Sequence, residues 1–204
     1  MKDEVYDAYL EAGELARKVL HRGAGLVKEG ASLLEMVEDT ETMVIDEGAH
    51  LAFPLNVSLN EDAAHDTAMP GDERIFSRGD LVKVDLGVQV DGYIADTALT
   101  VDLGDHANLV KASREALEAA IAIVRPGITA GEIGAVIQDT IEEHNYRPVA
   151  NLTGHGLDYY DLHTKPTIPN IAMSGGAVIE EGMAFAIEPF VTTGSVRVTE
   201  GARV

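Results

Sequence analysis

The sequence contains no cysteine and little positive charge. Without cysteine there can be no disulfide and no thiolate ligand, so any bound metal must be held by oxygen and imidazole donors. No apolar run approaches the length of a membrane span, and charge begins at Lys2, which argues against a signal peptide. We therefore expect a cytoplasmic protein with no membrane partner.

Basic residues are outnumbered: 15 lysines and arginines against 35 aspartates and glutamates give a formal net charge of −20. A surface of this sign repels nucleic acid and anionic lipid, so DNA is not expected as a partner. Hydrophobic residues make up 46% of the chain, which is more than a disordered acidic tail would contain. The balance fits a cytoplasm rich in salt, where screening weakens self-repulsion, and we expect a halophilic source.

Apolar periodicity predicts four helices, over Asp3 to Lys28, from Ser32 to about Glu47, over about Ala107 to Val124 and from Thr129 to about His144. The buried stripe predicted for the first helix consists of Tyr6, Leu10, Leu15, Val19 and Leu26. Ser32 with Glu35, and Thr129 with Glu132, have the spacing of capping boxes. Two further segments are expected to be extended, His50 to Asn60 and Val191 to Val198.

The chain also repeats itself. Two alignments carry the repeat, Gly30 to Met36 with Gly127 to Ile133 at an offset of 97, and Arg78 to Asp85 with Glu181 to Glu188 at an offset of 103. His65 matches His155 at an offset of 90. We predict one domain over residues 1–204, with halves of about 1–105 and 106–204, that arose by duplication and has a site at the seam.

The stretch from Val82 to Val101 predicts a β-hairpin, because Asp91-Gly92 lies between two alternating runs of hydrophobic residues. A turn centred on that dipeptide places Gly87 opposite Asp96. Glycine has no side chain, so this register leaves room beside the carboxylate for a bulky group.

The same register places Asp85 opposite Ala98, so that Asp85 and Asp96 are diagonal neighbours on one face of the hairpin. A plainer interpretation is that both acids are solvated. The neighbours of Asp85 are mostly valine and leucine, however, and two carboxylates on a covered face repel each other unless a cation lies between them. The pair alone favours a metal site only modestly.

The repeat adds His155 and Glu188 to this pair. Three carboxylates and one imidazole suit a hard or borderline divalent ion such as Mn, Fe or Co better than a structural zinc. Two ions are expected, because paired metals need carboxylates that bridge them. Four other histidines lie in charged segments or near helix ends and are interpreted as structural: His21, His50, His106 and His144.

Several motifs resemble those of one known family. They are Phe53-Pro54, Ser58 to His65, Val84 to Ala98 with its acids eleven residues apart, Gly154-His155-Gly156 through His163 to Pro166, and Ala186 to Pro189. In this order they resemble the methionine aminopeptidases, and within them the type 2 branch of archaea and eukaryotes. The resemblance implies an α+β pita-bread fold of two pseudo-symmetric halves, each helix, helix and strand, with a curved, mostly antiparallel sheet covered by helices.

The resemblance also implies residue roles. Asp85 would chelate one metal, Asp96 would bridge two, and His155 with Glu188 would hold the other, the ions being Co, Mn, Fe or Zn. Two histidines, His65 and His163, would contact the substrate or transition state as catalytic groups. Two apolar side chains, Phe53 and Leu162, would line the pocket for methionine.

The implied activity is hydrolytic removal of the N-terminal methionine from peptides and nascent proteins when the next residue is small. We expect a monomer that meets the ribosome transiently. The family's fifth ligand is a glutamate near the C-terminus, and Glu200 is the one candidate counterpart here. Because side chains alternate along a strand, we expect Glu200 to point away from the face that carries the metal ligands. We therefore expect that the C-terminal part is missing, that Glu200 does not substitute, and that activity is low.

Two alternatives remain open. One is a proline-directed peptidase of the same fold with a similar ligand set, against which the segment from His155 to His163 argues. The other is a non-catalytic pita-bread module that binds a partner through its apolar pocket or surface. Retention of four ligand residues argues against such a module, since a binding surface has no need of them.

Overall fold

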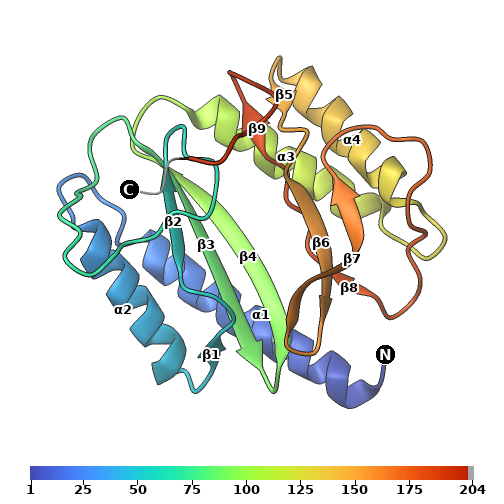
Figure 1. Ribbon diagram of the computed structural model, residues 1–204, viewed down its shortest axis with the longest axis horizontal. Coiled ribbons are helices and arrows are strands. Elements are labelled where there is room, and N and C mark those ends of the chain that lie inside the picture. The colour runs from blue at the N-terminus through green and yellow to red at the C-terminus, as the bar shows by residue number, and fades with distance from the viewer. Residues whose placement is uncertain (202–204) are drawn as a thin grey trace. The chain divides into compact units, whose positions relative to one another are not determined.

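The computed structural model describes residues 1–201 and divides into two compact units. The first unit comprises residues 1–106 and 158–162, and the second comprises residues 107–157 and the described residues from 163 onward. Each unit has its own helices and strands (Figure 1). Each also has its own hydrophobic core. None of the described helices has the length and apolar character required to cross a membrane.

A four-stranded antiparallel sheet forms the centre of the first unit. Its strands are β1 (His50–Leu51), β2 (Asn56–Leu59), β3 (Leu81–Val90) and β4 (Tyr93–Asp102). Strand β3 pairs with β4 along one edge and with β1 and β2 along the other. The expected extended segment is thus two short strands, because Pro54 between them cannot donate a ladder hydrogen bond.

The β3–β4 hairpin confirms the predicted register. Val90 lies opposite Tyr93, with Asp91 and Gly92 in the turn at φ angles of 50° and 84°. Two successive positive φ angles are the signature of a type I′ turn, whose twist matches that of the flanking strands. The turn residues therefore determine which face every side chain of the hairpin occupies.

On one face of β3, four of the even-numbered residues are fully buried: Val82, Val84, Leu86 and Val88. Helices α1 (Asp3–Ala24) and α2 (Leu33–Asp46) cover this face, with α1 lying along β3 and β4 (Figure 1). The odd-numbered residues of β3, which include Asp85, point to the opposite face. The hydrophobic effect thus leaves the acidic face clear of the helices.

The stripe predicted for α1 is partly wrong. Tyr6 and Leu10 are 56% and 50% exposed, whereas the buried residues of the helix are mainly small: Ala8, Ala12, Ala16, Val19, Leu20 and Gly23. A stripe of small side chains lets a helix approach its neighbours closely, as at Gly23, where an added Cβ would lie 2.6 Å from Thr40 Oγ1. Packing distance, rather than residue hydrophobicity, selects the buried side of α1.

The second unit contains two helices, α3 (Ala107–Ile123) and α4 (Ala130–Glu143), which pack together. Its strands are β5 (Arg147–Pro148), β6 (Thr153–Asp158), β7 (Asp161–Pro169), β8 (Ala184–Phe185) and β9 (Val191–Thr192). Strands β7, β6 and β8 form one sheet, and β5 pairs with β9 in another. The last strand is shorter than expected, and the residues beyond it form hydrogen bonds with the side chains of Arg147 and Asn151 instead.

The two units share a local backbone pattern that supports the internal repeat. Ser32 bridges to Ile75 in the first unit, and Thr129 bridges to Val178 in the second. The amide of Gly30 donates to the Phe76 carbonyl at 2.8 Å, just as Gly127 donates to Ile179 at 2.8 Å. These pairs differ by the offsets 97 and 103 on which the sequence alignment rested.

The helix caps of the two units differ. Thr129 and Glu132 form a complete capping box, in which the threonine amide donates to Glu132 Oε2 at 2.8 Å and Thr129 Oγ1 accepts from the Glu132 amide at 3.3 Å. At Ser32 only the second half is present, with Oγ accepting from the Glu35 amide at 3.3 Å. The reciprocal box predicted at Ser32 is therefore incomplete.

Candidate functional site

The first unit carries two carboxylates on the face of its hairpin that α1 and α2 do not cover. Asp85 lies opposite Ala98, and Asp96 lies opposite Gly87, so the two acids are diagonal neighbours with backbones about 7–8 Å apart. Both residues are half-buried. Carboxylates at this spacing can turn toward a common point, which is the arrangement that the sequence predicted.

Phe53 fills the space beside these acids. A Cβ added to Gly87 would lie 2.2 Å from the Phe53 ring, so the ring covers the strand where the glycine lacks a side chain. The amide of Ala52 donates to the Gly87 carbonyl at 2.9 Å and fixes the backbone next to the ring. A half-buried aromatic ring therefore lies over Gly87, opposite Asp96, and its predicted contact with a methionine side chain stays a prediction.

Lys83 lies two residues before Asp85 and shares its face of β3, although it is not among the site residues predicted from the sequence. Burial lowers the pKa of Lys83 to about 8. The charges of Asp62 and Glu61 act in the opposite direction and raise this pKa, but their effect is smaller. Its Nζ donates to the Asn60 carbonyl at 2.8 Å. Strand parity was the signal that would have placed this lysine beside the acids.

His65 is carried by the loop that follows β2. Its φ angle is 66°, in the left-handed region that few residues other than glycine adopt, and its side chain is exposed. Backbone conformations of this kind gather at functional sites, where the surrounding structure holds them in place. The predicted catalytic histidine thus lies in an unusual local conformation.

In the second unit, His155 lies on β6 between two glycines that permit close backbone contacts. A Cβ added to Gly154 would lie 2.2 Å from the Ala186 carbonyl oxygen, and one added to Gly156 would lie 2.1 Å from that of Lys165. The Ala186 amide donates to the His155 carbonyl at 2.8 Å. The glycines therefore allow neighbouring strands to flank the histidine tightly on both sides.

Glu188 lies directly beside this histidine. His155 Nε2 is 3.1 Å from Glu188 Oε1, and the other ring nitrogen, Nδ1, is 3.2 Å from the Gly156 carbonyl oxygen. A proton on Nδ1 would donate to that carbonyl and leave the Nε2 lone pair facing the carboxylate. His163 completes the group, its ring centroid lying 4.4 Å from that of His155.

The pair of His155 and Glu188 fits a divalent metal ion. Glu188 Oε1 is buried and accepts no hydrogen bond of regular geometry from residues 1–201. Two ligand atoms each about 2.1 Å from one ion, at an angle of about 90°, would be about 3 Å apart. The observed 3.1 Å matches this separation, and an imidazole with a carboxylate suits a borderline divalent ion.

Other predicted residues lie outside these two groups. Leu162 is half-buried on β7, and Glu200 is exposed. Three of the histidines interpreted as structural have local partners: His21 with the Arg17 carbonyl, His106 with Asp102 and His144 with Glu115. These contacts explain the three side chains without a catalytic role.

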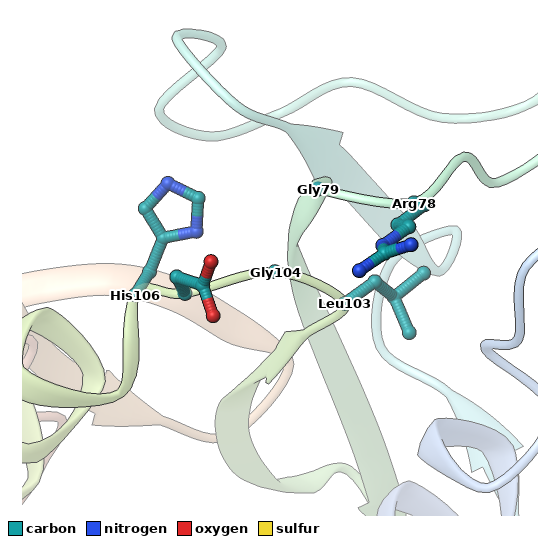
Figure 2. Close-up of a pocket in the computed structure, with 6 residues that line it drawn as sticks. Arg78, Gly79, Leu103, Gly104 and His106 are labelled. Atoms are coloured by element: carbon teal, nitrogen blue, oxygen red, sulfur yellow. The ribbon is translucent and has the colours of Figure 1, made fainter.

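A surface hollow of about 580 Å³ lies elsewhere in the first unit. Arg78 and His106 stand on opposite sides of it, with Gly79, Leu103 and Gly104 between them (Figure 2). It contains none of the residues predicted to bind metal or substrate. We therefore assign it no part in the candidate site.

Comparison with known proteins identifies the family of the chain. Residues 7–204 match the model of metallopeptidase family M24. The chain is 48% identical over 200 residues to a methionine aminopeptidase of Archaeoglobus fulgidus, covering 98% of this chain and 69% of that protein. It is 46% identical to the methionine aminopeptidase of Methanothermobacter thermautotrophicus, covering 97% of this chain and 67% of that one.

Solved structures agree with these relatives. The crystal structure of a methionine aminopeptidase from Thermotoga maritima superposes with a TM-score of 0.92 at 29% identity, covering 99% of this chain and 85% of its own. The prolidase from Pyrococcus horikoshii gives a TM-score of 0.79 at 26% identity, covering 92% of this chain and 55% of its own.

The fold is thus that of metal-dependent peptidases. The chain belongs to metallopeptidase family M24, with methionine aminopeptidases among its relatives. The resemblance and the α+β pita-bread fold predicted from the sequence are confirmed. The chain spans about two thirds of the length of the two archaeal relatives.

Proposed function

We propose that the protein removes the N-terminal methionine from peptides and nascent proteins by metal-dependent hydrolysis of the first peptide bond. The observation that carries the proposal is the identity of 48%, over 98% of the chain, to a methionine aminopeptidase. The two acids of the hairpin support it, as does the contact between His155 and Glu188. The preferred substrates have a small second residue, because a pocket mouth discriminates by excluding larger side chains.

Four residues are proposed to hold two divalent ions, Co, Mn, Fe or Zn. The first unit supplies Asp85 and Asp96, and the second supplies His155 and Glu188. Bound ions would polarise the scissile carbonyl and lower the pKa of water. Asp96 would bridge both ions, as the family resemblance implies.

The remaining roles fall to side chains of the chain itself. His65 and His163 donate hydrogen bonds to the substrate carbonyl or to the charge that develops on its oxygen. Phe53, held over Gly87, and Leu162 contact the methionine side chain. The net charge of −20 attracts the free ammonium group of a peptide N-terminus.

The setting proposed is the cytoplasm of an organism with a high internal salt concentration. The excess of 35 acidic over 15 basic residues supports this setting, since screening by salt reduces the repulsion among carboxylates. Nascent chains supply the substrate, through transient contact with the ribosome, and the protein acts as a monomer.

The test is to load the purified protein with Mn²⁺ and to measure metal content together with methionine release from Met-Ala and Met-Lys peptides. We expect bound metal and release from the Met-Ala peptide at least about tenfold faster than from the Met-Lys peptide. Equal rates on the two peptides would refute the specificity. A protein that binds Mn²⁺ but releases no methionine would refute the function.

A second candidate function is cleavage beside proline. The structural match to prolidase, with a TM-score of 0.79 at 26% identity, is the observation in its favour. The same assay with an Ala-Pro dipeptide separates the two, because the methionine pocket offers no reason to accept alanine. Faster hydrolysis of Ala-Pro than of Met-Ala would favour the second function.

A further inference from the structure

The imidazole of His65 depends on its backbone for its position. The ring is exposed and makes no hydrogen bond or ion pair within residues 1–201. Its φ angle of 66° lies in the left-handed region, which is unfavourable for a residue other than glycine. Contacts made by neighbouring residues must therefore hold the histidine where it is.

The residues after His65 are tied to the preceding strand. The Val57 amide donates to the Asp66 carbonyl at 2.7 Å, and the Asp66 amide donates to Ser58 Oγ at 3.3 Å. Thr67 Oγ1 donates to the Leu55 carbonyl at 2.6 Å. These bonds fix the inner side of the loop against β2.

Arg74 fixes the outer side of the same loop. Its Nη1 donates to Asp66 Oδ2 at 2.5 Å, and its Nη2 donates to the Thr67 carbonyl at 3.0 Å. Asp72 holds the guanidinium in place, accepting from Nε at 2.9 Å and from Nη2 at 2.7 Å. The planar fork of arginine thus joins both residues that follow His65 to one rigid group.

The backbone of Arg74 is itself anchored. Its carbonyl accepts from the Leu33 amide, at the first residue of α2, at 3.1 Å. Two residues later, Phe76 is fully buried and exchanges hydrogen bonds with Gly30 and Ala31 at 2.8 and 2.9 Å. The guanidinium therefore projects from a fixed base toward the loop of His65.

The described residues of the second unit have no such arrangement. By the offset of 103, the residue equivalent to Arg74 is Ala177, whose carbonyl accepts from the Ala130 amide just as that of Arg74 accepts from Leu33. The equivalent histidine, His155, lies within strand β6 and is held by sheet pairing. The backbone frame is thus repeated, whereas the guanidinium is present only where the histidine lies on a loop.

We propose that Arg74 is a positioning residue for His65: it holds Asp66 and Thr67 so that the imidazole keeps the direction needed to meet the substrate carbonyl. This proposal rests on the proposed function. A lysine at this position keeps the positive charge but cannot form the planar fork of hydrogen bonds. Arg74→Lys therefore tests the geometry of these hydrogen bonds while the charge stays the same.

The kinetic test is a double-mutant cycle with His65 in the metal-loaded protein. We expect Arg74→Lys to lower kcat for a Met-Ala peptide about tenfold with KM within twofold, and His65→Ala to lower it about 100-fold. In the His65→Ala background, Arg74→Lys should cause no further loss, because its effect passes through the missing imidazole. Losses that multiply, or no loss from Arg74→Lys alone, would overturn the proposal.

Arg22→Lys is the matched control, since Arg22 pairs with Glu47 at 3.4 Å in the same unit, whereas Arg74 bonds to Asp66 and Thr67. It should leave kcat unchanged. Circular dichroism of every variant checks that the fold is intact.

A second readout does not depend on activity. Carbon–proton NMR of the histidine rings, with His65 assigned from the His65→Ala variant, should show its signals shifted and narrowed in Arg74→Lys but not in Arg22→Lys. Unchanged signals would overturn the positioning role even if the protein released no methionine. Shifted signals without methionine release would instead refute the proposed function and leave the positioning of the loop established.

Discussion

The two units build the same backbone junction and attach different chemistry to it. In each unit, a helix begins next to a β-bridge, and the bridged segment leads toward a candidate carboxylate ligand. The backbone hydrogen bonds at this junction match between the two units. The first unit then carries its acids on a long hairpin, whereas the second places Glu188 beyond the two-residue strand β8. The comparison shows that a duplicated frame can be retained while the side chains that it presents diverge.

The largest effects are expected from neutral variants of one ligand in each unit. Asp96→Asn and Glu188→Gln should each lower methionine release at least about 100-fold, because loss even of a residue that only supports a ligand costs up to about 100-fold. Calorimetry should show weakened Mn²⁺ binding in both variants. If Asp96→Asn binds Mn²⁺ as tightly as the unmodified protein, the first unit supplies no ligand through this residue.

Two glycine variants compare how tightly the units pack around their candidate residues. A Cβ at Gly154 would meet a backbone oxygen at 2.2 Å, whereas a Cβ at Gly87 would meet the Phe53 ring, which can rotate away. We expect Gly154→Ala to lower the free energy of unfolding by about 3 kcal/mol and Gly87→Ala by about 1 kcal/mol. Urea denaturation measures both values, and the reverse order would contradict the comparison.

Gly87→Ala should have a second effect, on substrate binding. Displacement of the Phe53 ring from the hairpin should raise KM for a Met-Ala peptide severalfold with a smaller change in kcat, because the ring contacts the side chain and not the scissile bond. Phe53→Leu is the matched variant, since it shortens the ring contact without a clash. A fall in kcat alone in both variants would exclude Phe53 from the methionine pocket.

Removal of the two helix caps should give smaller effects. Thr129→Ala breaks a complete capping box and should lower the free energy of unfolding by about 1–2 kcal/mol, whereas Ser32→Ala breaks a single bond and should cost about 0.5–1 kcal/mol. If urea denaturation shows equal losses of unfolding free energy, the hydrogen bond from the Thr129 amide to the Glu132 carboxylate adds no stability.

The smallest effect is the pH dependence of that cap. Hydrogen bonds from the amide and hydroxyl of Thr129 lower the pKa of Glu132 below its ordinary value of 4.5. A carboxylate whose pKa is lower in the folded state stabilises the fold above about pH 4.5, and this stabilisation is lost as pH falls through the lowered pKa. The cost of Thr129→Ala should therefore be smaller at pH 3 than at pH 7, while that of Ser32→Ala stays constant.

The sequence predicted the hairpin and its register because the two turn residues and the alternation of side chains are local signals. The group of His155, His163 and Glu188 was likewise predicted, from the repeat together with family motifs. Local signals fix local geometry, and the repeat extends them to segments far apart along the chain.

Other features could not be predicted in this way. The buried side of α1 is lined mainly by alanine, whose small side chain carries little periodic signal, so Tyr6 and Leu10 were misplaced. Arg74 was missed because its bonds to Asp66 and Thr67 join residues whose proximity depends on the folded loop. A cluster of side chains from separate turns leaves no regular spacing in the sequence.

The tyrosines of the first unit have a practical consequence. Tyr9, Tyr93, Tyr159 and Tyr160 form a chain of ring contacts, with centroids 4.7 to 5.5 Å apart. Since the protein has no tryptophan and only six tyrosines, these rings dominate its near-ultraviolet optical activity and its intrinsic fluorescence. The protein thus carries a built-in spectroscopic reporter for one unit, against which loss of helical signal from the whole chain can be timed during unfolding.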